Sequence, residues 1–354
     1  MSTLNMNSPP STSTNKTSED SNQVLDLDNK VILVTGGTGS FGKAFVRTVL
    51  NRSAPRKLII FSRDEAKQYE MQNNPAYGSD KRLRFFLGDV RDVNRLEMSF
   101  RDVDYVVHAA ALKQIPAAEY NPFECIRTNV HGAENVVTAA IRAGVQKVIA
   151  LSTDKAANPI NLYGASKLAS DKIFVAAKNL TGTGPPYFSV VRYGNVIGSR
   201  GSVIPLFRKL LQDNAKTLPI TDERMTRFWI TLEQGVEFVL SCAGIMRGGE
   251  IFVPKIPSMK ITDLAAVIAP KLPYQIVGIR PGEKLHEEMI TEDEARSTVE
   301  LPDRYVIRSP HYEHQPYAVG ENLVPESFRY TSNSNTYWLS PSEMRSLIKD
   351  SDFG

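Results

Sequence analysis

The sequence predicts an α/β protein with a doubly wound parallel sheet and a smaller C-terminal lobe. Short β-branched runs alternate with helical stretches between residues 30 and 200, and a glycine-rich turn connects the first run to the first helix. Continuous apolar runs are typical of strands buried on both faces, and their alternation with helices is typical of βαβ units. The 354 residues suffice for such a sheet with an appended lobe.

The strands and helices are expected in a regular order up to residue 200. Predicted strands cover residues 31–34, 57–61, 83–87, 105–107, 148–151 and 188–191, and predicted helices cover 43–50, 132–143 and 166–177. We expect this domain to span residues 29–200. Beyond it, prolines interrupt the periodicity. Residues 201–354 are therefore expected to form mostly a substrate-binding lobe and a C-terminal extension, with some segments able to return to the sheet.

The N-terminal residues 1–28 are expected to form a disordered tail. Ser, Thr, Asn and Pro dominate it, and its apolar residues are too sparse to offset the entropy of ordering. The tail lacks the apolar central region of a secretory signal. A transit peptide is the other interpretation, and Glu19, Asp20, Asp26 and Asp28 argue against it.

The composition excludes several classes of protein. Forty-two Lys and Arg against 39 Asp and Glu leave a net charge of +3, too balanced for a general nucleic-acid-binding protein. No stretch approaches the roughly 20 apolar residues of a membrane span. Cys125 and Cys242 have neither a CxxC pattern nor a nearby His, so we interpret both as core thiols of a cytoplasmic protein without a metal site.

A glycine-rich turn after the first strand predicts a phosphate cradle and a Rossmann-type sheet. Glycines at such a turn allow a tight bend, close approach to a pyrophosphate and close helix packing. The helix that follows offers free N–H groups and a positive dipole end to phosphates. A structural turn without a ligand is the alternative. The expected cradle consists of Gly36, Thr38, Gly39, Ser40, Phe41 and Gly42.

The residues after the second strand bear on the choice between NADP and NAD. An acidic group there accepts a hydrogen bond from a ribose 2′-OH, whereas Arg accommodates a 2′-phosphate. Ser62 and Arg63 come first and Lys67 follows one helical turn later, so we favour NADP. NAD is the alternative, because Asp64 offers an acidic group for the ribose 2′-OH. A separate alternative is that Arg63 is an ordinary surface charge without a role in binding.

Two further strand ends are expected beside the cofactor. Asp89, next to Val90, can accept a hydrogen bond from an adenine amino group or cap the following helix. Small side chains from Ala109 onward let a cofactor lie directly on the backbone. His108 precedes them, and a lone His in such a place is as often structural as catalytic.

The spacing of Tyr163 and Lys167 predicts a reaction centre. Residues four apart lie on one face of a helix. A phenol has a reference pKa of about 10, and a neighbouring ammonium together with a cationic nicotinamide favours the phenolate. Lys167 can also hold the nicotinamide ribose. This pattern is common by chance, and its place one strand after the Ala-rich strand end makes it specific.

Longer motifs resemble one enzyme family. The stretches that carry the resemblance are LSTDKAANPINLYGASK, VVRYGNVIGSRGSV, MTRFWITL and GIRPGEKLHEEMI. Together with the cradle they are similar to the inverting UDP-N-acetylglucosamine 4,6-dehydratases, which are extended short-chain dehydrogenases/reductases that start the route to pseudaminic-acid-type sugars. The resemblance covers roughly residues 29–300 and continues weakly to the end.

The resemblance implies a lyase with bound NADP. It would dehydrate UDP-N-acetylglucosamine across C5 and C6 with inversion at C5, giving UDP-2-acetamido-2,6-dideoxy-β-L-arabino-hexos-4-ulose through a 4-keto intermediate. Oxidation at C4 is needed because the C5 proton is acidic only beside a carbonyl. Asp154 and Lys155 are the expected acid and base, and the resemblance implies that Lys155 serves C5. Retaining relatives carry Asp-Glu at these two positions.

These two roles make demands on the pKa of each residue. Burial must lower the pKa of Lys155 so that it is partly neutral, and the pKa of Asp154 must rise so that it carries a proton. Adjacent opposite charges oppose both shifts, so the pair is expected to share a proton and titrate as a unit. A surface Asp-Lys pair without chemistry is the alternative.

Further site residues are carried over from the resemblance. Arg280 suits the diphosphate of the substrate, because its planar fork matches phosphate geometry. Gln114 stands where the family more often has His, which is a small departure. A homo-oligomer, either a dimer or a hexamer, is also implied. The implied substrate residues are Lys113, Asn195, Val203, Thr221, Arg280 and Glu283, and the remaining cofactor residues are Leu151, Ser152, Val196 and Arg200.

Two other functions are compatible with parts of this pattern. A UDP-sugar 4-epimerase keeps Tyr163 and Lys167 but has no need of the Asp154–Lys155 pair. A non-catalytic dinucleotide-binding sensor usually loses the Tyr or the Lys, and both are present here.

Overall fold

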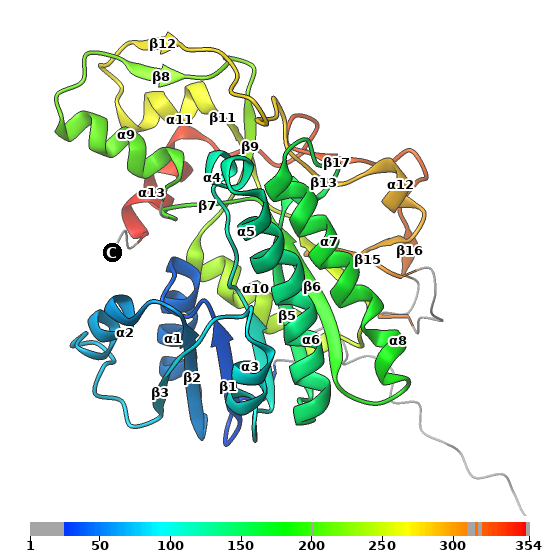
Figure 1. Ribbon diagram of the computed structural model, residues 1–354. Helices are drawn as coiled ribbons and strands as arrows, with labels where there is room; N and C mark the ends of the chain where they lie inside the picture. Colours follow the sequence, from blue (N-terminus) through cyan, green and yellow to red (C-terminus); the bar gives the residue numbers. More distant parts are fainter. Residues whose placement is uncertain (1–24, 200, 310–315, 318–320, 352–354) are drawn as a thin grey trace, which may run out of the picture.

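The computed structural model describes residues 25–199, 201–309, 316–317 and 321–351, and within them a ten-stranded sheet runs through the molecule (Figure 1). The part from β3 to β10 is parallel, in the order β3-β2-β1-β4-β5-β6-β10. The predicted α/β class with a doubly wound parallel sheet is thereby confirmed. These strands are β1 (Val31–Thr35), β2 (Lys57–Ser62), β3 (Leu83–Leu87), β4 (Tyr105–His108), β5 (Lys147–Thr153), β6 (Tyr187–Tyr193) and β10 (Ile251–Pro254).

The sequence of the central strands explains why they lie in the middle of the sheet. Every residue of β1 is buried, as expected for a β-branched run covered on both faces. In register, Thr35 lies opposite Phe61 of β2 and His108 of β4. Because the strands are parallel, their carboxyl ends meet at one edge of the sheet, and the segments that follow them form one site there.

Helices cover both faces of the sheet (Figure 1). α1 (Ser40–Arg52) packs against α10 (Leu232–Ile245) on one face, and α3 (Val93–Ser99), α6 (Gly132–Ala143) and α7 (Leu162–Ala176) pack together on the other. The predicted helix at 166–177 begins four residues earlier than expected, because the Asn161 side chain caps it at Gly164 N (2.7 Å). The remaining helices of this half are α2 (Glu65–Gln72), α4 (Ile115–Tyr120), α5 (Pro122–Ile126) and α8 (Lys178–Thr181), with a π-helix at Arg127–His131.

A smaller lobe lies above the carboxyl ends of the parallel strands (Figure 1). It has its own apolar core, in which Phe207, Trp229, Leu264 and Met344 are buried. Its elements are β7 (Asn195–Val196), α9 (Val203–Gln212), β8 (Leu218–Ile220), β9 (Thr226–Ile230), β11 (Ser258–Lys260), α11 (Ile261–Ile268), β12 (Tyr274–Ile276) and α13 (Pro341–Asp350).

Later segments of the chain return to the main sheet. β10 extends its parallel part, and β15 (Arg304–Ile307), β14 (Thr298–Glu300) and β16 (Asn322–Leu323) add antiparallel strands beyond it. A separate ladder joins β13 (Glu288–Ile290) to β17 (Tyr330–Thr331), and α12 (Glu292–Ala295) lies between β13 and β14 in the chain. Residue 200 therefore marks a change of rhythm in the sequence but does not divide the sheet.

The inner end of the predicted tail is part of the fold. Leu27 is buried in the main core, and Asp28 Oδ1 accepts a hydrogen bond from Ala54 N (2.7 Å). The folded chain thus begins before residue 29, where the sequence analysis places the start of the domain. Residues 1–24, which make up the rest of the predicted tail, lie outside the described residues.

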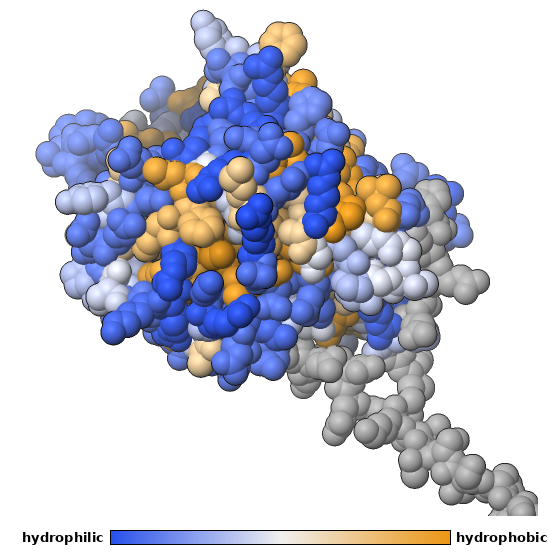
Figure 2. All heavy atoms as spheres, turned by 60° about the horizontal axis from the view of Figure 1, so that its bottom comes forward, coloured by the Kyte–Doolittle hydropathy of each residue, from blue (hydrophilic) through white to orange (hydrophobic). Residues whose placement is uncertain are grey.

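The outer surface carries a mixture of side chains. The face in Figure 2 is mostly hydrophilic, with apolar residues in patches between charged ones. In the described part of the chain, no helix combines the length and the apolar character that a membrane crossing requires.

Candidate active site

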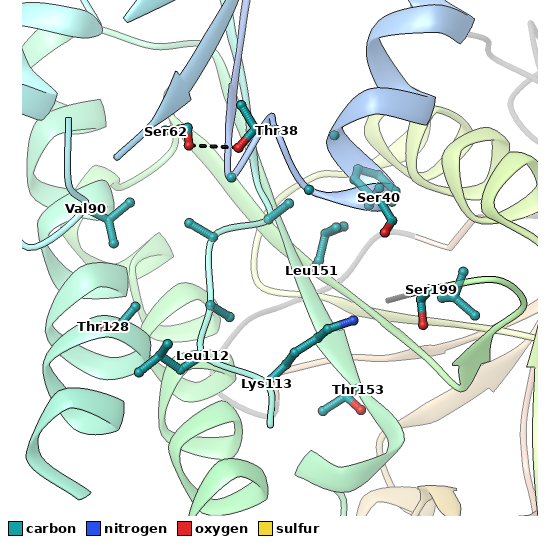
Figure 3. A pocket seen from close by; sticks show the side chains of 18 of the residues that line it. Thr38, Ser40, Ser62, Val90, Leu112, Lys113, Thr128, Leu151, Thr153 and Ser199 are labelled. Carbon is teal, nitrogen blue, oxygen red and sulfur yellow. Dashed lines mark hydrogen bonds between the residues drawn. The ribbon is translucent and has the colours of Figure 1, made fainter. Parts of the chain in front are cut away.

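A cavity of about 600 Å³ lies at the carboxyl edge of the parallel strands (Figure 3). The segments after β1, β2, β3, β4 and β5 line it from the sheet, and α7 and β7 contribute from the sides. Nearly every residue predicted for the cofactor lies on its wall, and Arg200 lies outside the described residues. The predicted cofactor residues on the wall are Gly36, Thr38, Gly39, Ser40, Phe41, Gly42, Ser62, Arg63, Asp64, Lys67, Asp89, Val90, Ala109, Leu151, Ser152, Tyr163, Lys167 and Val196.

The cradle requires glycine at two positions. Gly36 has a φ of +66°, and a Cβ there would lie 2.9 Å from the Ala110 Cα. A Cβ on Gly42 would lie 2.4 Å from the Gly37 Cα. α1 then begins with neither a side-chain cap nor an acidic residue in its first turn. Its first N–H groups are left to bind an anion in the cavity, as a dinucleotide pyrophosphate requires.

The segment after β2 places two cations at the cavity wall. Arg63 Nη1 lies 3.5 Å from Asp89 Oδ2, and Lys67 forms an ion pair with Asp64. Asp64 also caps α2 by accepting from Lys67 N (3.0 Å), and these hydrogen bonds from Lys67 hold the pKa of Asp64 below its ordinary value. The Asp64 carboxylate is therefore already engaged by the protein.

The sequence left two interpretations open for Asp89, as adenine acceptor or helix cap, and two for His108, as structural or catalytic. The hydrogen bonds of both residues bear on the choice. α3 is capped by Asp92, and Asp89 instead accepts hydrogen bonds from Arg91. His108 is buried, and its Nδ1 lies 2.8 Å from Thr35 Oγ1. Burial and the charge of Lys167 lower the pKa of His108 to about 3, so it is neutral and its role is structural.

The surroundings of Tyr163 differ from the expected ones. Burial raises the pKa of Tyr163 to about 12, while the charge of Lys155 and a hydrogen bond with Thr153 act to lower it. Lys167 Nζ donates to Leu151 O (2.7 Å), and burial lowers the pKa of Lys167. Lys155 is the charge that acts to lower the pKa of Tyr163 in this structure, and the role of Lys167 in favouring the phenolate stays a prediction.

Thr153 is a site residue that the sequence analysis missed. Successive side chains of a strand point to opposite sides. Ser152 Oγ donates to Asp171 Oδ2 (2.8 Å) of α7, whereas Thr153 Oγ1 donates to Asp154 Oδ1 (2.9 Å), and both residues line the cavity. The alternation along β5 was the signal that could have identified Thr153.

The Asp154–Lys155 pair is buried at the end of β5. Lys155 Nζ lies 3.0 Å from Asp154 Oδ1 and 3.1 Å from Glu287 Oε1. Burial raises the pKa of Asp154 despite the opposing charge of Lys155, as predicted. The predicted lowering of the Lys155 pKa was wrong: burial lowers it, but the carboxylates of Asp154 and Glu287 outweigh burial and raise it.

Glu287 and Arg227 bring further charge to this pair and were also missed. Arg227 Nε lies 3.5 Å from Glu287 Oε1, and the Arg227 guanidinium donates to the carbonyl oxygens of Lys284 (2.9 Å) and Leu285 (3.0 Å). Both residues lie within motifs that carried the resemblance. No pattern in those motifs indicates that either side chain is turned toward residue 155.

The residues predicted for the substrate divide into two groups. Lys113 and Asn195 line the cavity, and Figure 3 shows the Lys113 side chain reaching into it. Burial lowers the pKa of Lys113, and Asn195 Oδ1 is buried without a hydrogen-bond partner among the described residues. The predicted substrate residues that do not line this cavity are Val203, Thr221, Arg280 and Glu283, all in the lobe.

Those lobe residues have other surroundings. Val203 begins α9 and packs against the core of the lobe, whereas Arg280 is exposed in a turn. Glu283 Oε1 lies 3.9 Å from Arg227 Nη2. The described residues contain no group of three His, Cys, Asp or Glu side chains placed to hold a metal ion.

Residues 32–309 match a family of polysaccharide biosynthesis proteins. The chain belongs to this family. An inverting UDP-N-acetylglucosamine 4,6-dehydratase from Campylobacter jejuni is 55% identical over 92% of this chain and 99% of its own length. A UDP-glucose 4-epimerase from Rickettsia bellii is 40% identical over 92% of this chain and 97% of its own. The predicted resemblance to the inverting dehydratases is thereby confirmed, and the family is one of enzymes.

Solved structures of this kind share the fold. Pen from Bacillus thuringiensis superimposes with a TM-score of 0.84 at 36% identity, covering 92% of this chain and 99% of that one. The dTDP-glucose 4,6-dehydratase DesIV from Streptomyces venezuelae, solved with NAD bound, gives 0.65 at 27% identity, covering 72% and 86%.

Proposed function

We propose that this chain dehydrates UDP-N-acetylglucosamine across C5 and C6 with inversion at C5, giving UDP-2-acetamido-2,6-dideoxy-β-L-arabino-hexos-4-ulose. One observation carries the proposal. A buried carboxyl with a raised pKa and a lysine lie in contact at the end of β5, in the cavity that Tyr163 also lines. The 55% identity to a dehydratase of this name over nearly the whole chain agrees with it.

A dinucleotide fits the residues of the cavity. The glycines at 36 and 42 allow the close backbone contacts that shape the turn, and the open N-terminus of α1 suits a pyrophosphate. The bound nicotinamide would supply a hydride acceptor and donor. We favour NADP because Arg63 and Lys67 offer cations for a 2′-phosphate, while Asp64 is engaged in capping α2 and in its ion pair.

The side chains of this chain would then move the protons. Tyr163 takes the proton of the C4 hydroxyl, helped by Thr153 and by the charge of Lys155. Once C4 is a ketone, Lys155 takes the C5 proton and Asp154 gives its proton to the departing C6 hydroxyl. Lys113 and Asn195 offer a cation and an amide to the nucleotide sugar.

Other features stay predictions from the resemblance. They are the contacts of Val203, Thr221, Arg280 and Glu283 with the substrate, the homo-oligomeric state and the link to pseudaminic-acid-type sugars. Each would follow from membership of the inverting dehydratases.

A 4-epimerase is the second candidate, because relatives bearing that name are 40% identical over 92% of the chain. Incubation with UDP-N-acetylglucosamine followed by proton NMR of the product separates the two functions. Dehydration predicts a methyl signal at C6 and the inverted C5 configuration. An epimerised sugar with its C6 hydroxyl intact would reject the dehydratase and support the epimerase.

A further inference from the structure

We propose that Glu287 is a positioning residue of the acid–base centre, which orients Lys155 and stabilises the ammonium that forms when Lys155 takes the C5 proton. The inference rests on the proposed dehydration and adds a residue from the segment before β13 to an acid–base pair at the end of β5. Glu287 directly precedes β13, about 130 positions after the pair that it contacts.

The geometry places the Lys155 ammonium between two carboxylates. Asp154 Oδ1 lies 3.0 Å away and Glu287 Oε1 lies 3.1 Å away, and they come from separate elements. The Glu287 side chain is 2% exposed, so this contact is removed from solvent. A buried charge pair of this kind is weakly screened and fixes the direction of the amine.

The surroundings of Glu287 distinguish it from a carboxylate that serves only the fold. Its Oε2 is buried and has no hydrogen-bond partner among the described residues. Two further cations lie near Glu287, Arg227 and Lys284. Arg227 donates to the backbone carbonyls of residues 226, 284 and 285. The adjacent Glu288 behaves differently, because its Oε1 accepts from Arg329 Nε (2.8 Å) on the β17 side.

The charges that form during the proposed dehydration explain what Glu287 contributes. Before dehydration Asp154 holds a proton and Lys155 is neutral. The C5–H bond breaks as the N–H bond forms on Lys155, and the C6–O bond breaks as Asp154 protonates the leaving hydroxyl, which departs as water. The centre then contains a carboxylate and an ammonium, and a second carboxylate beside the ammonium stabilises the charge as it develops.

The charged and titratable groups that face Lys155 all have to be considered. They are Asp154 on its own segment, Glu287 before β13, Arg227 on β9, Lys284 in the preceding turn and Tyr163 on α7. Arg227 and Lys284 oppose a charge on Lys155, and Asp154 is needed as the acid. Glu287 is therefore the group whose charge favours the ammonium throughout the reaction.

The test compares Glu287→Gln with Glu288→Gln, which changes a neighbouring carboxyl outside the centre. For Glu287→Gln we expect KM to stay within a few-fold and kcat to fall by about 10–100-fold, as for supporting residues of other sites. In the dependence of kcat on pH, the inflection that reports deprotonation of Lys155 should move to lower pH, because the ammonium loses the carboxylate of Glu287.

The control variant Glu288→Gln should have the same kcat, KM and pH dependence as the parent chain. A parent-like profile for Glu287→Gln, or a loss without a shifted limb, would overturn the proposal.

A second measurement does not depend on turnover. The Lys155 ammonium can be titrated by NMR with ¹³C-labelled lysine and assigned by its disappearance in Lys155→Met. A lower pKa of Lys155 in Glu287→Gln than in the parent chain is expected, and an unchanged value would refute the inference. If the parent chain leaves UDP-N-acetylglucosamine unchanged, the dehydratase function fails and this titration still decides the role of Glu287.

Discussion

Lys155 illustrates how one residue can reverse an expectation drawn from a motif. Burial alone would lower the pKa of an amine, as a base near neutral pH requires. Here the carboxylates of Asp154 and Glu287 raise it, so the amine is an ammonium in the unliganded chain. The pair can reach its reactive form when the proton moves from Lys155 to Asp154, whose pKa is itself raised.

The choice of cofactor depends on two side chains. In the double variant Arg63→Ala, Lys67→Ala we expect NADP to bind at least about 100-fold more weakly, because two charge-assisted hydrogen bonds of about 1.5–3 kcal/mol each are lost. Binding of NAD should change by only a few-fold. Isothermal titration with both dinucleotides measures the difference. Arg91→Ala, which removes a nearby cation outside the cavity wall, is the control, and equal losses for NADP and NAD would contradict the assignment.

His108 should make the stability of the fold depend on pH. Its pKa is about 3 in the folded chain and about 6.5 in the unfolded one. Between these values the unfolded chain binds the extra proton, so the free energy of unfolding falls as pH decreases through this range, by about 2 kcal/mol from pH 7 to 5. His108→Asn removes the titration. Denaturant unfolding at several pH values should show a shallower dependence in the variant, and an identical dependence would exclude His108 as its source.

Among the secondary-structure elements, the turn between β1 and α1 depends on close contacts between backbone atoms of its own residues. Gly42→Ala would place a Cβ 2.4 Å from the Gly37 Cα, and α1 must move away from the turn to accept it. We expect dinucleotide affinity to fall by at least about 100-fold, because the N–H groups of α1 no longer point toward the pyrophosphate.

A matched control comes from another helical glycine. A Cβ on Gly235 of α10 would meet nothing within 4 Å. Gly235→Ala should bind the dinucleotide normally and raise the free energy of unfolding by about 0.5–1 kcal/mol. Fluorescence titration and thermal denaturation measure both effects. Normal binding by Gly42→Ala would show that the cradle does not hold the cofactor.

The start of α7 connects Tyr163 to the lobe. Asn161 Oδ1 caps the helix at Gly164 N, and Asn161 Nδ2 donates to Gly282 O (2.7 Å). Lys284 Nζ adds a bond to Ala157 O (2.7 Å). The turn at residues 280–284 is therefore bonded twice to the segment that precedes Tyr163.

Two variants separate these functions of Asn161. Asn161→Asp keeps the cap but loses the donor to Gly282, whereas Asn161→Ala loses both. Since a lost cap costs about 1 kcal/mol, the Ala variant should unfold at the lower temperature, and both should turn over substrate more slowly than the parent chain. Parent-like turnover by Asn161→Asp would show that the bond to the lobe does not position Tyr163.

For the whole molecule, the features that could be predicted from the sequence are those determined by neighbouring residues. The buried runs of β1 and β2, the cradle and the Tyr163–Lys167 spacing follow from the chemistry of a few adjacent residues. The early start of α7 and the place of Thr153 depend on a cap and on strand alternation, which are also local signals.

Contacts between distant parts of the chain were not predictable in this way. Glu287 and Arg227 approach Lys155 only because β9 and the segment before β13 fold over the end of β5. The return of β10 and β15 to the sheet likewise depends on tertiary packing. The resemblance implied that Val203 and Arg280 contact the substrate, but motif membership carries no information on where their side chains point.

The proposed dehydration requires that C4 is oxidised to a ketone before water leaves from C5 and C6 of the same sugar. UDP-N-acetylglucosamine carrying deuterium at C4 tests it directly, with the position of the label read by NMR and mass spectrometry. We expect deuterium to move to the C6 methyl group while C5 acquires a solvent proton. Deuterium that returns to C4, in a sugar that keeps its C6 hydroxyl, would contradict it.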